Sequence, residues 1–193
     1  AFSLIGVLIA SAIMGVPVFR DYDHQTSEIY FSKPITKKGY LYGRYVGSLI
    51  VLVAIFAAIN LGTLIGHAMP WVKSSDLQAF NLSAYWQPFL VLQLPTILVT
   101  GTIFFALGSL SKRLIVIYTQ GIGFFLLFTI ALQLSDNLAS EFTAALIDPF
   151  GFNAIQLLTK YWTINDKNAL MIPFQGPLVY NRLIWLGIAV LIF

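Results

Sequence analysis

Cysteine is absent from the 193-residue chain, and charged residues make up only 10% of it. Without cysteine, neither a disulfide framework nor a cysteine-based zinc or iron–sulfur site can form. A soluble domain is about one quarter charged, so the shortage of charge excludes a disordered chain, a nucleic-acid-binding partner role and an ordinary cytosolic enzyme. Apolar residues are abundant instead, at 58% of the total. This composition indicates a membrane protein.

Long uncharged segments separate the clusters of charged residues. Residues 45–72, 77–111 and 114–135 are uncharged runs of 28, 35 and 22 residues, and residues 1–19 and 183–193 are also uncharged. Because about 20 apolar residues cross a bilayer core of about 30 Å, the three internal runs are long enough to span a membrane. Their composition and length favour helices over barrel strands.

We therefore predict an all-α integral membrane protein, a polytopic transmembrane helix bundle forming one domain over residues 1–193. The predicted spans are residues 2–19, 41–66, 88–110, 114–134 and 182–193, and Pro95 predicts a kink in the third. The chain begins with Ala1 and stops inside an apolar run. We interpret it as a piece of a longer protein, truncated at both ends.

Lysine and arginine are unevenly divided among the segments that join these spans. Residues 20–44 and the turn at 112–113 hold seven of them, whereas residues 67–87 and 135–182 hold four. Since basic residues concentrate in cytoplasmic loops, we predict that segment 20–40 is cytoplasmic and that segment 135–181 is extracytoplasmic. Its apolar stretches, 138–147 and 150–158, are too short to cross, which predicts a re-entrant or interfacial region.

Small residues recur at four-residue spacing along the second predicted span, in one pair and then in a run of four. Such stripes mark helix contact faces in membranes, because close packing drives association there. The stripe suits packing inside one subunit or a face between subunits. Its members are Gly43, Gly47, Ala54, Ala58, Gly62 and Gly66.

Three uncharged polar side chains lie inside predicted spans: Asn60, Gln93 and Gln120. Each can donate a hydrogen bond across a helix interface. They are candidates for structural hydrogen bonding or for lining a substrate pathway.

Segment 20–40 joins the first two predicted spans and is rich in charged and aromatic residues. Asp21 or Asp23 can cap a short helix, and Pro34 ends it. The apolar residues Tyr22, Ile29 and Phe31 are expected to be partly exposed on this helix. A short helix with these residues at the membrane surface predicts a protein partner.

This segment also carries a spaced pattern that leads into the next span: Thr26-x-Glu28-Ile29-x-x-Ser32-x-Pro34-Ile35-x-Lys37, then Tyr40, Gly43 and Arg44. The pattern resembles the membrane subunit of ABC-2-type ABC transporters, in which approximately G-T-x-E-x-L-x-S-x-P-I-x-R joins the second and third spans. Gln25 stands in place of the usual glycine, and Tyr30 stands near the usual leucine.

The resemblance implies six spans per half and a bacterial inner-membrane permease that works with partners. These implied partners are a second half or a homodimer, membrane lipid and a separate ATP-binding cassette ATPase. ATP and Mg²⁺ would bind to that ATPase, because this chain has no G-x-x-x-x-G-K-[ST] loop. The permease itself would be a transport subunit of an exporter, not an enzyme. The short helix would dock in a groove of the ATPase, with Asp21, Asp23 and Glu28 facing basic groups and Tyr22, Ile29 and Phe31 filling the groove.

A second set of motifs lies near the end of the chain: Asp148-Pro149-Phe150-Gly151-Phe152, Tyr161-Trp162-Thr163, Asn168 and Asn181-Arg182-Leu183-Ile184-Trp185. It resembles bacterial ABC permeases associated with an M1-type aminopeptidase domain. The peptidase zinc motif H-E-x-x-H does not occur in this sequence.

Two alternatives belong to other classes. A polytopic membrane enzyme could use Asp21-x-Asp23 with His24 to hold Mg²⁺ or Mn²⁺ against a diphosphate. The second alternative is a non-enzymatic scaffold or channel, although no filter or charged ring is visible in the sequence.

Overall fold

The computed structural model describes residues 2–32, 34–67, 69–70, 80–111, 113–136 and 140–193. Within these ranges it holds helices and no strand, so the all-α prediction is confirmed. The elements are α1 (Phe2–Asp23), α2 (Thr26–Phe31), α3 (Lys37–His67), α4 (Leu82–Pro88), η2 (Phe89–Gln93), α5 (Leu94–Ser111), α6 (Leu114–Asp136), α7 (Glu141–Ile147), α8 (Phe152–Leu158), α9 (Ile164–Ala169) and α10 (Pro177–Ile192).

Among the described residues, three helical stretches are long and apolar enough to cross a membrane: Ile5–Asp23, Lys37–His67 and Leu82–Ser111. Leu114–Ile130 and Pro177–Ile192 are shorter apolar helices. A helix therefore covers each of the five predicted spans. The first extends beyond its predicted end at residue 19, so that Asp21 lies in the last turn of α1.

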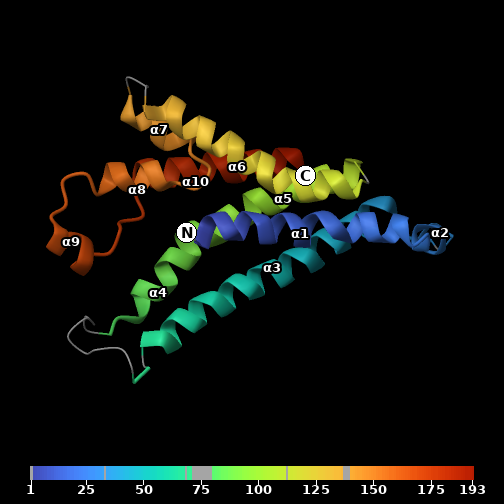
Figure 1. The fold of residues 1–193 in the computed structure, drawn as a ribbon, viewed down its shortest axis with the longest axis horizontal. Coiled ribbons are helices and arrows are strands. Elements are labelled where there is room, and N and C mark those ends of the chain that lie inside the picture. Colours follow the sequence, from blue (N-terminus) through green and yellow to red (C-terminus); the bar gives the residue numbers. More distant parts are fainter. Residues whose placement is uncertain (1, 33, 68, 71–79, 112, 137–139) are drawn as a thin grey trace.

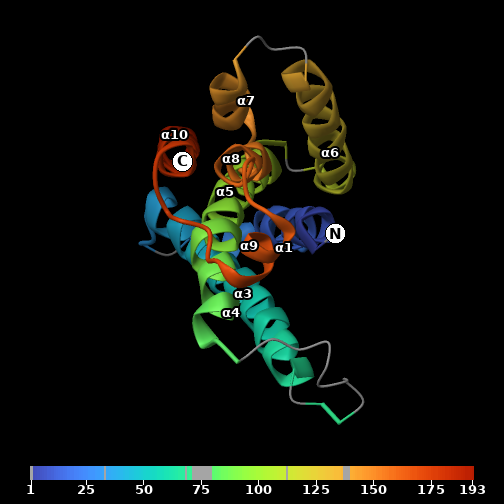
Figure 2. The same cartoon turned by 90° about the vertical axis from the view of Figure 1, so that its left-hand side faces the viewer.

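The connecting segments alternate between the two ends of the molecule. In Figure 1, α2, the end of α5 and the start of α6 lie at one end, whereas α4 and α7 to α9 lie at the other. Figure 2, viewed along the bundle, shows α5 near the centre. It packs against α1, α3, α6 and α10. The segments richest in lysine and arginine thus share one end of the bundle, as the predicted topology requires.

Close packing of α1 against α5 depends on two glycines. A Cβ atom on Gly108 would lie 2.7 Å from the carbonyl oxygen of Gly15 and 2.8 Å from its Cα. The two backbones approach where neither residue has a side chain. Around this crossing, Met14 and Phe104 are almost fully buried.

Hydrogen bonds between helices supplement this packing. Ser11 Oγ on α1 donates to the carbonyl of Ile117 on α6 at 2.7 Å, and Tyr45 on α3 pairs with Thr102 on α5 at 2.8 Å between their hydroxyl oxygens. Such bonds satisfy polar groups that the bilayer core could not.

The third predicted span contains a π-helical turn rather than continuous α-helix. The turn, Phe89–Gln93, lies directly before the first turn of α5, which contains Pro95. Proline lacks a backbone N–H, and its ring crowds the carbonyl four residues earlier, which here is Val91 inside the turn. A π turn at this point follows from that conflict and locates the irregularity that Pro95 predicted.

Candidate functional site

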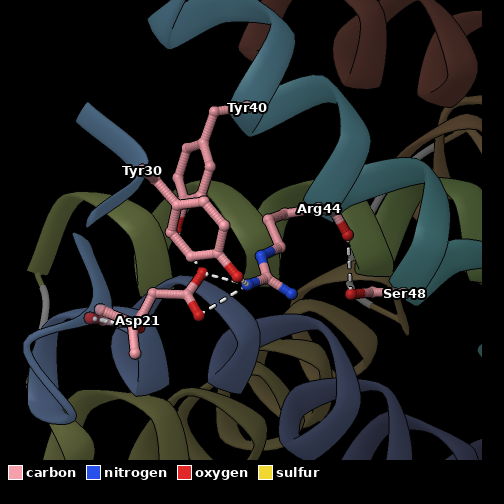
Figure 3. Close-up of polar contacts among 6 residues, drawn as sticks. Asp21, Tyr30, Tyr40, Arg44 and Ser48 are labelled. Carbon is pink, nitrogen blue, oxygen red and sulfur yellow. Dashed lines mark hydrogen bonds and ion pairs between the residues drawn. The ribbon is translucent and has the colours of Figure 1, made fainter. Parts of the chain in front are cut away.

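The corner formed by α1, α2 and α3 contains a cluster of four side chains, which we name the Asp21 cluster: Asp21, Tyr30, Tyr40 and Arg44. Nη2 of Arg44 lies 2.6 Å from each carboxylate oxygen of Asp21. The Tyr40 hydroxyl donates to Oδ2 of the same carboxylate at 2.5 Å. The guanidinium group also lies over the ring of Tyr30, 5.6 Å from its centroid. Figure 3 shows the four side chains converging from the three helices.

Burial makes this ion pair stronger than an ordinary surface pair. The Asp21 side chain is 11% exposed and that of Arg44 is 36% exposed. An isolated carboxylate at this depth would be costly, whereas here a cation and a hydroxyl both bind it. The Asp21 cluster therefore fixes the end of α1 to the start of α3, and α2 lies between them.

The turn from α1 into α2 depends on the backbone of Gln25. Among the described residues, Gln25 is the one non-glycine with positive φ, at 56°. Helices often end with a residue in this left-handed conformation, usually glycine. The hydroxyl of Thr26 then donates to the carbonyl of Asp21 at 3.1 Å. The start of α2 is thus held through Thr26, not through the Asp21 or Asp23 cap that the sequence suggested.

Replacing Gln25 by glycine should stabilise this turn. A left-handed residue with a side chain carries about 1–2 kcal/mol of strain, part of which is offset because glycine has more freedom when unfolded. We expect Gln25→Gly to raise the free energy of unfolding by up to about 1 kcal/mol. Chemical denaturation in detergent measures this, with Gln25→Val as the opposite control. A Gln25→Gly variant that is less stable than wild type would contradict the claim that the backbone of Gln25 is strained.

The residues predicted to face a partner divide into two groups. Asp23, Ile29 and Pro34 are exposed, and Ile29 has 61% of its surface accessible. Asp21 is buried in the ion pair, and Tyr22 packs against the main core. Both therefore make internal contacts, and their predicted contact with a partner stays a prediction.

The side chains of Glu28 and Phe31 lie outside the described part of the structure, so their predicted contacts with a partner stay predictions. From the sequence, Tyr40 and Arg44 were expected only as part of the pattern that leads into the next span. One feature of the sequence could have predicted their pairing with Asp21. Opposite charges lie where one predicted span ends and the next begins.

The second set of motifs forms another buried polar cluster, where the α7–α8 corner meets α10. Asp148 accepts hydrogen bonds from the backbone N–H groups of Phe150 at 2.8 Å and Asn153 at 2.9 Å. Nδ2 of Asn181, which is fully buried, donates to the carbonyls of Ala145 at 2.8 Å and Asp148 at 2.7 Å. The two motifs, separated by some thirty positions in the chain, therefore bind each other.

Arg182 extends this cluster to α5. Its guanidinium donates to the carbonyls of Pro149 and Phe150, and Nη1 lies 3.3 Å from the hydroxyl of Thr96 on α5. Trp185 donates from Nε1 to the carbonyl of Leu146 at 3.1 Å. One turn of α10 thus donates hydrogen bonds to carbonyls that have no partner within the short helices of the α7–α8 corner. In or near a membrane, such carbonyls need a donor from the protein.

Gly151 is required at this corner for two reasons. Its φ is +74°, and a Cβ atom there would overlap Nη2 of Arg182. We expect Gly151→Ala to lower the free energy of unfolding by about 2 kcal/mol, through backbone strain and displacement of the guanidinium. Gly187→Ala, on the open side of α10 with nothing within 4 Å of the added carbon, is the matched control. Equal stability of the two variants in chemical denaturation would refute this.

Two further polar contacts involve Lys160, which is exposed after α8, and Asp166 on α9. Lys160 lies 2.5 Å from Glu141, and this hydrogen bond raises the pKa of the lysine. At the start of α9, Thr163 and Asp166 form a reciprocal capping box. Hydrogen bonds from the hydroxyl and then the backbone N–H of Thr163 lower the pKa of Asp166.

The capping box gives α9 a pH dependence of known sign. Because the pKa of Asp166 is lower when folded, the cap stabilises α9 above the unfolded pKa of about 3.9 and is lost as pH falls through the folded value. Thr163→Val should return the pKa of Asp166 toward its ordinary value. A carboxyl NMR titration measures the change, and an unaltered titration would contradict the role of Thr163.

The structure brings together two of the three polar residues predicted within spans. Nδ2 of Asn60 donates to Oε1 of Gln93 at 2.6 Å. Gln93 lines a cavity of about 120 Å³ between α1, α3 and α5, with Thr96 and Phe150 on its wall. Gln120 lies elsewhere, between α6 and α1, where Nε2 donates to the carbonyl of Ser11 at 3.3 Å.

The small-residue stripe on α3 lies on an open face of this chain. Added Cβ atoms on Gly43, Gly47, Gly62 and Gly66 would meet nothing within 4 Å, and Ala54 and Ala58 are exposed. The stripe therefore does not pack inside the described subunit. Its role in helix packing stays a prediction for a contact with another chain.

No protein-family model, curated protein or solved structure matches this chain. In the part of the chain that the structure describes, the fold is all-α and three helices are long and apolar enough to span a membrane, which is compatible with a multi-pass membrane protein.

Proposed function

We propose that this chain is the membrane-spanning permease subunit of an ABC-2-type ATP-driven exporter in a bacterial inner membrane. In this proposal the helices form part of the translocation pathway, and α2 is the coupling helix that binds a separate ATP-binding subunit. ATP and Mg²⁺ bind to that subunit, and a second permease half or a second copy completes the assembly.

One observation carries this proposal: α2 is held between two long apolar helices while part of its surface is exposed. The Asp21 cluster joins α1 to α3 at the base of the corner. Ile29 on α2 and Ile35 after it are exposed, and so is the charged residue Asp23 at the end of α1. Because the Asp21 cluster fixes α2 to both long helices, a movement of α2 would move those helices too. Exposed apolar residues with charged residues near them in sequence are typical of a surface that binds another protein.

The competing enzyme hypothesis requires a free carboxylate pair at Asp21 and Asp23. Asp21 is already bound by Arg44 and Tyr40. In the part of the chain that the structure describes, no group of three or more metal-binding side chains occurs. A diphosphate-binding metal site at this corner would have to break the ion pair, so this observation favours the permease.

Association with an ATP-binding cassette subunit tests the proposal. The full-length protein is to be purified from its native membrane in mild detergent, and ATP hydrolysis by the purified complex measured. Ile29→Arg should remove the ATPase, because a charge in the docking groove is costly. Ile164→Arg, at a position 83% exposed on α9, should retain it. A wild-type protein without an associated ATP-binding subunit, or equal activity of both variants, would overturn the proposal.

A further inference from the structure

A groove lies between α1, α2 and α3, beside the Asp21 cluster. Its volume is about 660 Å³, which is in the usual range for small-molecule sites. Residues that line it include Ile13, Val16, Arg20, His24, Arg44 and Gly47. The wall comes from both long helices, and part of it comes from the short helix.

The groove changes from apolar to charged along the helix direction. Ile13 and Val16 on α1 and Val51 on α3 line the part nearer the middle of the bundle, whereas Arg20 and Arg44 line the part nearer α2. Ile13 and Arg20 are about 10 Å apart along the helix axis at 1.5 Å per residue. This polarity matches that of a molecule with an apolar chain and a charged head, standing parallel to the helices.

Hydrogen-bond donors remain available at the charged end. The contacts of Arg44 with Asp21 and Tyr30 use Nη2, and Tyr40 also bonds to the guanidinium. A guanidinium has five N–H donors, so Arg44 keeps donors for another group. Arg20 is exposed, and no ion pair joins it to any residue that the structure describes. Since Arg44 and Tyr40 already bind the carboxylate of Asp21, Arg20 gives this end of the groove a net positive charge.

Glycine provides the space at the side of the groove formed by α3. A Cβ atom on Gly43 or Gly47 would meet nothing within 4 Å. Both residues line the groove. Larger side chains at these positions would fill the space next to α1.

We propose that this groove binds one anionic phospholipid from the leaflet that faces α2. Arg20 and Arg44 bind the headgroup phosphate, and an acyl chain lies along Ile13, Val16 and Gly47. Basic pockets between membrane helices on the cytoplasmic side bind anionic headgroups, and arginine binds phosphate through paired donors. The site needs the membrane location but not the ATPase, so it stands or falls independently of the proposed transport function.

Native mass spectrometry of the purified full-length protein tests the site. The protein is to be reconstituted in nanodiscs with equal amounts of phosphatidylglycerol and phosphatidylcholine, and the lipid retained after release counted. Wild type should retain phosphatidylglycerol in preference. Arg20→Gln and Gly47→Leu should each reduce its retention roughly tenfold, by loss of a charged contact or by filling the groove.

Two matched controls exclude general effects of charge and size. Arg113→Gln removes another exposed arginine, and Gly62→Leu enlarges another open glycine of α3; both should retain phosphatidylglycerol as wild type does. Equal retention of the two lipids, or equal loss in Gly47→Leu and Gly62→Leu, would overturn the proposal. So would loss of a dimer in Gly47→Leu with unchanged lipid, because the groove would then be occupied by a second copy. If Gly47→Leu fails to fold, Arg20→Gln decides.

Discussion

Asn181→Leu is expected to lower the free energy of unfolding by about 3 kcal/mol, because it removes the hydrogen bonds that a buried amide donates to three backbone carbonyls. Nδ2 of Asn181 serves the carbonyls of Ala145, Leu146 and Asp148. Leucine has a similar size and cannot donate, so the loss reports the hydrogen bonds rather than a cavity. Chemical denaturation in detergent, followed by tryptophan fluorescence, measures it.

Leu183→Ala is the control for this experiment, since Leu183 lies two residues further along α10 with an exposed side chain. Its cost should be below about 1 kcal/mol. If Asn181→Leu were no more destabilising than Leu183→Ala, the α7–α8 corner would not depend on α10. The contribution that we assign to this cluster would then be wrong.

The second large effect concerns the Asp21 cluster. Asp21→Ala and Arg44→Ala should each lower the free energy of unfolding by about 3 kcal/mol, because each leaves the other charge without its partner in a partly buried site. The double variant should cost less than the sum of the two by about 1–2 kcal/mol. A double-mutant cycle in denaturant measures this coupling.

Tyr40→Phe is a smaller change in the same cluster, because it removes only the hydroxyl that donates to Asp21 and keeps the aromatic ring. It should cost about 1 kcal/mol. Additive effects of the Asp21 and Arg44 substitutions would show that the ion pair does not hold the corner. The fixed position of α2 would then need another explanation.

The helices were predictable because their signal is local. Uncharged runs of 22 to 35 residues can satisfy their backbone groups in a bilayer only as helices. The predicted alternation of the spans implied which connecting segments would share an end. In Figure 1, α2, the end of α5 and the start of α6 lie together at one end. What stays a prediction is which end faces the cytoplasm.

The contacts between helices were not predictable to the same degree. The stripe that begins with Gly43 and Gly47 fits the usual packing pattern but faces outward, whereas the close approach is made by Gly15 and Gly108. Spacing within one helix does not reveal which face meets a neighbour. Gly15 and Gly108 belong to different helices, so no pattern within either helix pairs them.

The candidate site was predicted in part for the same reason. The sequence placed a short helix in segment 20–40 and placed Ile29 on its exposed surface. It also assigned Asp21 to a partner, because the sequence alone did not show that Arg44, 23 positions later, would be close enough to bind it. A carboxylate in the last turn of a predicted span is better interpreted as needing a partner inside the membrane protein.

The central claim is that α2 lies at the cytoplasmic surface, where an ATP-driven subunit can bind it. The sequence has no cysteine. Ile29→Cys and Ile164→Cys, made separately, therefore each introduce a single thiol, and the two thiols lie at opposite ends of the bundle. A membrane-impermeant maleimide should label Ile29→Cys only in inside-out vesicles, and Ile164→Cys in intact cells. Labelling of Ile29→Cys from outside intact cells would contradict the account.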